Sequence, residues 1–257
     1  MINITIKAAR AHYQIEMDRQ IQIFETKATK QFRPILSRQF SNAAKLAQQG
    51  VTIIPAVDDE KGKLISILSK HYRQVATVFS DKVFKIIKVE KNFSVPETKG
   101  PKDEFWKVLN KWMLTQAGNK ITKVQKTTKR SIANIIKVGM DEGESNAEIA
   151  KRIRDAGLIS SPYRAKVIAR TETHTAANMS VDAAVKSTHV EMESEWVATL
   201  DERVRISHAK ADGQKIKQGE TFKVGGQDLK YPGDSNGSAE NVINCRCVLI
   251  YHTVKKS

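Results

Sequence analysis

The chain has 257 residues, of which 40% are apolar, so it can bury a hydrophobic core and full disorder is excluded. Its 43 Lys and Arg against 28 Asp and Glu give a formal net charge of +15. The sequence contains no uncharged apolar run of about 18 residues and no apolar signal segment near its amino end, so we expect neither a membrane span nor export. The two cysteines exclude a disulfide framework and fit a reducing cytoplasm.

The excess positive charge is confined to the first part of the chain. Residues 1–140 hold 26 basic and 11 acidic side chains, whereas residues 141–257 hold 17 of each. The neutral part is also rich in Gly, Asp and Asn. This shift in composition predicts two domains, a basic region over residues 1–140 and a second domain over residues 141–257.

The basic region is predicted to be helical, because its apolar residues recur at intervals of three and four. One apolar stripe runs from Ile21 to Ala43, with a kink or break expected at Pro34 and an end at Gly50. Further stripes occupy residues 64–87, 105–113 and 121–135, with a linker from Pro96 to Pro101. A helical bundle and elongated helical hairpins both fit this pattern.

Two helices are predicted after the basic region. Ser145 and Glu148 have the spacing of a capping box, which predicts a short helix that Gly157 ends. Ser161 before Pro162 predicts the start of another helix that runs to about Lys186.

The remaining segment changes to a period of two. Residues 190–200 alternate, with Trp196 on one face and glutamates on the other, which predicts a half-buried strand. A turn with a short helix is expected over 201–211, a hairpin centred on two glycines over 221–229, and a last strand over 242–251. The fold class is therefore α+β, with an extended, basic, helical amino-terminal region followed by a small domain of antiparallel strands.

A polar stripe marks the helix that follows Pro162. Arg170, His174 and Asn178 are spaced four apart and share one side of the helix, while Glu172 lies on the other. Hydrogen bonds that tie this helix to the strands are the simplest interpretation. Alternatively, His174 is a metal ligand or an acid/base group.

Cys245 and Cys247 are the partners that such a ligand would need. On a strand both thiols point to one face, and zinc would require two further ligands, for which His174 and His208 are the candidates. Zinc motifs usually place two to four residues between cysteines, so a single intervening residue also fits two small buried side chains without a cofactor. An enzyme built on this group would be a metal-dependent nuclease or other hydrolase, with Asp201 or Glu172 as acid/base.

A series of short motifs runs in order through residues 145–250. The residues that we single out in these motifs are Arg170, Glu172, His174, Asn178, Trp196, Asp201, Arg203, His208, Pro232, Asn244, Cys245 and Cys247. In this order and spacing the motifs resemble the Mu F-like phage head morphogenesis family. The resemblance implies a minor capsid protein of a tailed double-stranded DNA bacteriophage, needed for head assembly and located at the portal vertex in the capsid interior of the virion. It implies the portal protein and the major capsid or scaffold protein as partners and no catalytic residue, so we expect a structural protein rather than an enzyme.

The basic region suits packaged double-stranded DNA or an acidic capsid surface. A series of basic residues, mostly three apart, is predicted to form one broad helix face: Lys120, Lys123, Lys126, Lys129, Arg130 and Lys137. No motif for base readout is visible, so contact with DNA is expected to be non-specific.

Overall fold

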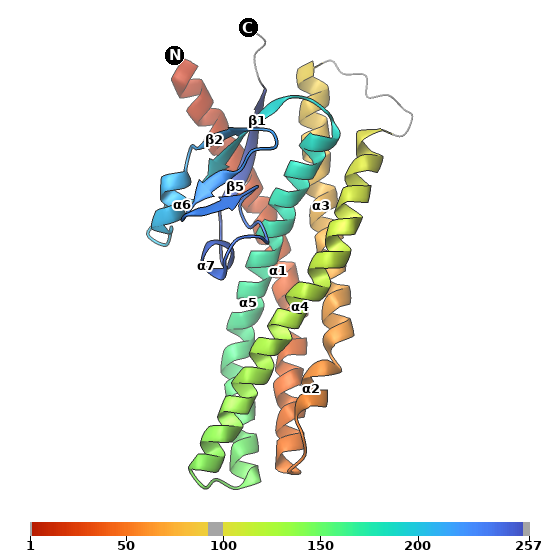
Figure 1. Ribbon diagram of the computed structural model, residues 1–257, viewed down its shortest axis with the longest axis vertical. Coiled ribbons are helices and arrows are strands. Elements are labelled where there is room, and N and C mark those ends of the chain that lie inside the picture. The colour runs from red at the N-terminus through yellow and green to blue at the C-terminus, as the bar shows by residue number, and fades with distance from the viewer. Residues whose placement is uncertain (1, 92–99, 254–257) are drawn as a thin grey trace. The chain divides into compact units, whose positions relative to one another are not determined.

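Four helices of more than 30 residues dominate the computed structural model, which describes residues 2–91 and 100–253 (Figure 1). They are α1 (Ile2–Gln48), α3 (Lys61–Lys91), α4 (Pro101–Asp141) and α5 (Asn146–Ser187), with the short α2 (Ile54–Asp58) between the first two. None of the helices in the described ranges combines the length and the apolar character needed to cross a membrane.

The apolar stripes predicted in the basic region are buried along most of their length, with Ile86 exposed. In α1, for example, Ala28, Phe32 and Leu36 are fully buried, and the helix ends just before Gly50, which has a positive φ. Of the kink or break predicted at Pro34, the break is wrong, because α1 continues through this residue, although a proline costs about 3 kcal/mol inside a helix. Burial of the apolar side chains on both sides of it offsets this cost.

The capping box at the start of α5 is confirmed. The Ser145 amide donates to the Glu148 carboxylate at 2.8 Å, and the Glu148 amide donates to the Ser145 hydroxyl at 3.3 Å. The predicted break at Gly157 and the new start at Pro162 are wrong, because α5 continues through both residues. Gly157 serves close packing, since a Cβ atom there would lie 2.5 Å from the Cβ atom of Phe40 on α1.

The carboxy-terminal segment forms two small antiparallel sheets, which confirms the α+β class. The elements are β1 (Met192–Val197), α6 (Ile206–Ala211), β2 (Lys215–Lys217), β3 (Phe222–Val224), β4 (Gln227–Leu229), α7 (Ala239–Val242) and β5 (Val248–Thr253). The larger sheet has the order β2–β1–β5, and the smaller is the predicted hairpin β3–β4, whose Gly225 and Gly226 have positive φ as a tight turn requires.

Two details of these strands differ from the prediction. The strand β1 lies between two others and is buried on both faces, so that Glu195 is buried and pairs with His252 at 2.6 Å. The strand β5 begins only at Val248, so Cys245 and Cys247 lie in the segment that leads into it rather than within it. Asn244, with a φ of 59°, turns the chain between α7 and this segment.

By its internal contacts the chain forms two compact units. The first unit comprises Met1–Glu25, Tyr72–Lys111 and Arg170–Ser257, and the second comprises Thr26–His71 and Trp112–Ala169. This division does not follow the composition shift near residue 140. Separation of residues 141–257 as a domain therefore stays a prediction.

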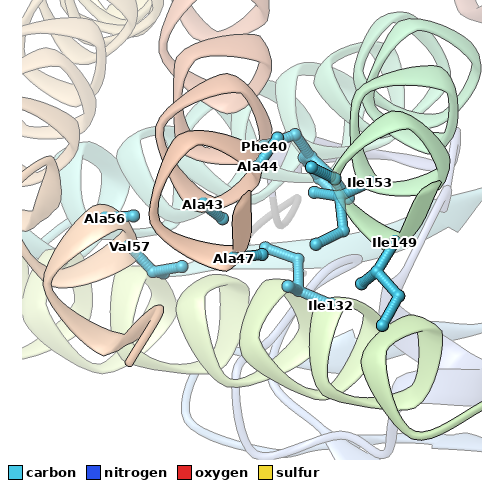
Figure 2. Close-up of a cluster of buried hydrophobic side chains, with 10 residues drawn as sticks. Phe40, Ala43, Ala44, Ala47, Ala56, Val57, Ile132, Ile149 and Ile153 are labelled. Carbon is cyan, nitrogen blue, oxygen red and sulfur yellow. The ribbon is translucent and has the colours of Figure 1, made fainter. Parts of the chain in front are cut away.

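The second unit has a core of small and branched apolar side chains (Figure 2). Phe40 and three alanines from α1 meet Val57 of α2, Ile132 of α4, and Ile149 and Ile153 of α5. Amide groups fix α2 against this core, because Gln39 and Gln125 both donate to the carbonyl oxygen of Val57, at 3.1 and 2.9 Å.

Candidate functional site

Three of the four predicted metal ligands converge in the first unit. The Nδ1 atom of His208, on α6, lies 3.3 Å from the Sγ atom of Cys247 and 3.7 Å from that of Cys245. The three possible ligand atoms all lie within 4.8 Å of one another. The side chains are 1–2% exposed. We call these three residues the Cys-His cluster.

The two thiols of the Cys-His cluster are not equivalent. The hydrogen bond with Cys247 lowers the pKa of Cys245 well below its usual value, and His208 and His174 act in the same direction against the effect of burial. The same hydrogen bond, together with burial, raises the pKa of Cys247 well above its usual value. Cys245 is therefore the thiol that gives up its proton first.

Aromatic packing and an amide hold the Cys-His cluster in place. The indole ring of Trp196 stands at 90° to the His208 ring, with 5.5 Å between their centroids. Asn178 on α5 donates to the carbonyl oxygens of Pro232 and Cys247, at 3.0 and 3.1 Å. Its side-chain oxygen accepts from the Leu249 amide at 2.8 Å. Asn178 therefore ties the helix to the segment that carries the cysteines, as the simplest interpretation of the polar stripe predicted.

His174 does not join the Cys-His cluster. Its Nε2 atom lies 3.3 Å from the carboxylate of Glu25 on α1, which Arg170 approaches at 3.5 Å. Burial alone would raise the pKa of Glu25, but the hydrogen bond and charge of His174, with Arg170, lower it. Glu172, on the other side of α5, accepts a hydrogen bond from the buried hydroxyl of Tyr72. These residues are held in ion pairs and hydrogen bonds within the first unit.

Asp201, the other predicted acid/base group, is bound by arginine. Both terminal guanidinium nitrogens of Arg246 donate to its carboxylate, at 2.5 and 2.6 Å, and the backbone amide of Arg203 donates to it at 3.0 Å. The hydrogen bond from Arg246 holds the pKa of Asp201 well below its usual range. A carboxylate in this state accepts hydrogen bonds but does not act as an acid near neutral pH.

Sequence reasoning missed the partners of the motif residues. Thr175 donates to the carbonyl oxygen of Gly233 at 3.0 Å, and a Cβ atom at Gly233 would lie 2.8 Å from the Thr175 hydroxyl. Asp234, which is buried, accepts from the amides of Lys230 and Asn236 and so closes the turn after Pro232. The Tyr-Pro-Gly-Asp sequence at residues 231–234 is typical of a turn, but it carries no signal for the contact of this turn with α5.

The second unit carries most of the net positive charge of the chain, +11 of +15, with 19 basic against 8 acidic side chains. Four of the six predicted basic residues are exposed and fall within an arc of about 60° on α4, at 3.6 residues per turn. They are Lys123, Lys126, Arg130 and Lys137, which we call the basic face. Lys129 instead pairs with Asp58 at 2.7 Å, and Lys120 is half-buried.

The region that contains the Cys-His cluster is similar to proteins of a known family. Residues 130–250 match the family described as "Phage Mu protein F like protein". The minor head protein GP7 of Bacillus phage SPP1 is 36% identical over 124 residues, which cover 47% of this chain and 40% of that protein. No solved structure matches.

Two further relatives match over a similar length. The NAD(+)-arginine ADP-ribosyltransferase EFV of Enterococcus faecalis is 32% identical over 124 residues, which are 47% of this chain and 25% of that protein. An uncharacterized protein of Haemophilus influenzae is 32% identical over 123 residues, 46% of this chain and 24% of its own length. The matches thus span less than half of each of these relatives.

Proposed function

Because residues 130–250 match the Phage Mu protein F-like family, we propose that this protein is a minor head protein that acts in the head morphogenesis of a tailed double-stranded DNA bacteriophage. The match to a minor head protein, 36% identical over 124 residues, is the observation that carries the proposal. The interior of the first unit fits a structural role. The motif residues Asn178 and Trp196 hold the helix, turn and strands together through buried hydrogen bonds and ring packing.

The place of action that we propose is the portal vertex, inside the capsid. The first unit contains the carboxy-terminal residues 170–257, which hold 12 basic and 12 acidic side chains, and this neutral segment suits docking on a protein. The portal protein is the partner that we propose first, with the major capsid or scaffold protein as a further partner during assembly.

Contact with packaged DNA is the second part of the proposal. The net charge of +11 on the second unit and the exposed basic face on α4 suit a polyanion. Lysine and arginine on one helix face neutralise phosphates without reading bases, so the contact would be independent of DNA sequence.

We propose no enzymatic activity. A nuclease or hydrolase centred on the Cys-His cluster is not favoured, because the three side chains are 1–2% exposed and a polymer substrate cannot reach them. The activity in the name of the Enterococcus relative is that of a protein of which the match covers 25%. Asp201 and Glu172, the predicted acid/base groups, are held by Arg246 and Tyr72, and we propose structural roles for both.

Affinity capture tests the proposed partners. The tagged chain, produced in cells in which its phage is assembling heads, should bring down the portal protein, identified by mass spectrometry. The same tag on an unrelated basic protein is the control for binding through charge. Capture of other proteins without any portal, capsid or scaffold subunit would contradict the proposal.

A further inference from the structure

The function proposed above does not use the Cys-His cluster, whose geometry suits a metal ion. We propose that the Nδ1 atom of His208 and the Sγ atoms of Cys245 and Cys247 form a zinc-binding site within the first unit.

The distances between the three ligand atoms match those that zinc imposes. With Zn–S bonds of about 2.3 Å and a Zn–N bond of about 2.05 Å, tetrahedral angles place sulfur and nitrogen about 3.6 Å apart and the two sulfurs about 3.8 Å apart. The observed separations of 3.3 and 3.7 Å between His208 Nδ1 and the two sulfurs bracket the first value. All three atoms lie within 4.8 Å of one another, so one ion can contact them with small side-chain movements.

The chemistry of the three ligands also selects the ion. Two thiolates and a neutral imidazole together carry a charge of about −2, which balances a divalent cation, so the site can stay buried without an unpaired charge. Thiolate ligands favour zinc over magnesium and calcium, which prefer oxygen. A tetrahedral ion takes one further ligand, which these three residues do not supply.

The surroundings hold the ligands in position before any ion is bound. Asn178 fixes the carbonyl oxygen of Cys247, and the ring of Trp196 packs against His208. Arg246, between the two cysteines, extends to the carboxylate of Asp201, and this ion pair fixes the backbone between the two ligands. An ion at this site would join α6 to the segment that enters β5, two parts of the chain that lie on either side of the β3–β4 hairpin in sequence.

Metal analysis of the full chain tests the site. The chain purified without chelator should contain about one zinc ion per molecule, since the ligands come from one chain. C245S and C247S should each lose most of this zinc, whereas H252Q, which changes a partly buried histidine on β5 that pairs with Glu195, should keep it.

A second measurement does not depend on whether the variants fold. Cobalt(II) added to the zinc-depleted wild-type chain should give the intense thiolate-to-metal charge-transfer and visible bands of tetrahedral cobalt, and zinc should abolish them. Purified chain without stoichiometric zinc, together with cobalt spectra that lack a thiolate band, would overturn the proposal and leave the cysteines as packed thiols that share hydrogen bonds with His208. Neither result bears on the role in head assembly.

Discussion

The side chain of Asn178 makes three buried hydrogen bonds to backbone groups that are distant in sequence. Its amide satisfies two carbonyl oxygens and one amide of the turn after Pro232 and of the segment around β5. An asparagine can do this because its side chain carries both donors and an acceptor. Aspartate at this position would lose the donors, and leucine would leave all three backbone groups without a partner.

We therefore expect N178A to destabilise the chain by about 3 kcal/mol, since three buried backbone groups lose their hydrogen bonds. Thermal or urea unfolding of the full chain measures this change. N134A removes an exposed asparagine from α4 and should change the stability by less than about 0.5 kcal/mol. Equal effects of the two substitutions would show that Asn178 does not hold the first unit together.

His71, in the second unit, provides a prediction on pH. Burial, with the charge of Lys27, lowers the pKa of His71 from 6.5 to about 4. The folded chain therefore keeps this histidine neutral, while the unfolded chain takes up a proton as the pH falls below about 6.5. The free energy of unfolding is therefore not reduced by His71 above that pH, and it decreases as the pH falls from about 6.5 towards about 4.

The size of this effect is about 2–3 kcal/mol between pH 7.5 and 4.5, because each unit of pKa corresponds to about 1.4 kcal/mol. The variant H71N should lose less stability than the wild type over this range, by about that amount. Urea unfolding of both chains at the two pH values gives the comparison. Parallel pH dependence in the two proteins would mean that His71 titrates normally.

At the scale of elements, periodicity predicts the helices well and their ends poorly. The apolar stripes of α1, α3 and α4 are buried as expected, because burial of one helix face is a local and repeated signal. The helix end predicted at Gly157 is wrong because a glycine that ends a helix and a glycine that allows close packing look alike in sequence. Only the position of Phe40, on another helix, distinguishes the two roles.

The candidate site was likewise predicted only in part from the sequence. The spacing of Cys245 and Cys247 and the presence of His208 predicted a cluster that the structure brings together. The pairing of His174 and Arg170 with Glu25 could not be predicted, since α1 is far away in sequence and its acidic residues carry no motif. The sequence therefore predicts which residue types can act as ligands, whereas the partners of His174 and Arg170 depend on tertiary packing.

Gly157 gives a test of helix packing in the second unit. G157A adds a Cβ atom 2.5 Å from the Cβ atom of Phe40, and the overlap should outweigh the better helix propensity of alanine, with a net loss of about 1–3 kcal/mol. G118A is the matched control, because this helical glycine on α4 has no atom within 4 Å of the added Cβ and should gain up to about 1 kcal/mol. A gain in both variants, measured by thermal unfolding, would refute the close contact between α1 and α5.

At the scale of the whole molecule, the excess positive charge is divided less sharply between the two compact units than between residues 1–140 and 141–257. The second unit still holds +11 of the net charge of +15. This excess supports the second unit as the place of the polyanion contact that we propose, and the first unit, with its motif residues, as the place of contacts between proteins.

Binding to DNA checks this assignment. The full chain should bind random duplex DNA, with the logarithm of affinity falling linearly with the logarithm of salt concentration, by about 0.9 for each phosphate neutralised. Replacing Lys123, Lys126, Arg130 and Lys137 with glutamine should lower the slope by up to about 3.6. The matched control replaces four exposed lysines of the first unit, Lys210, Lys215, Lys217 and Lys230, and should change the slope less. Equal losses would show that only net charge matters.

The composition of purified phage heads tests the central claim most directly. Heads from the phage that encodes this chain are isolated and their proteins are quantified by mass spectrometry against the major capsid protein. We expect the chain to be present in the heads, in far fewer copies than the major capsid protein and together with the portal protein. Its absence from both immature and mature heads, while the chain is abundant in the same lysate, would contradict the assignment as a minor head protein.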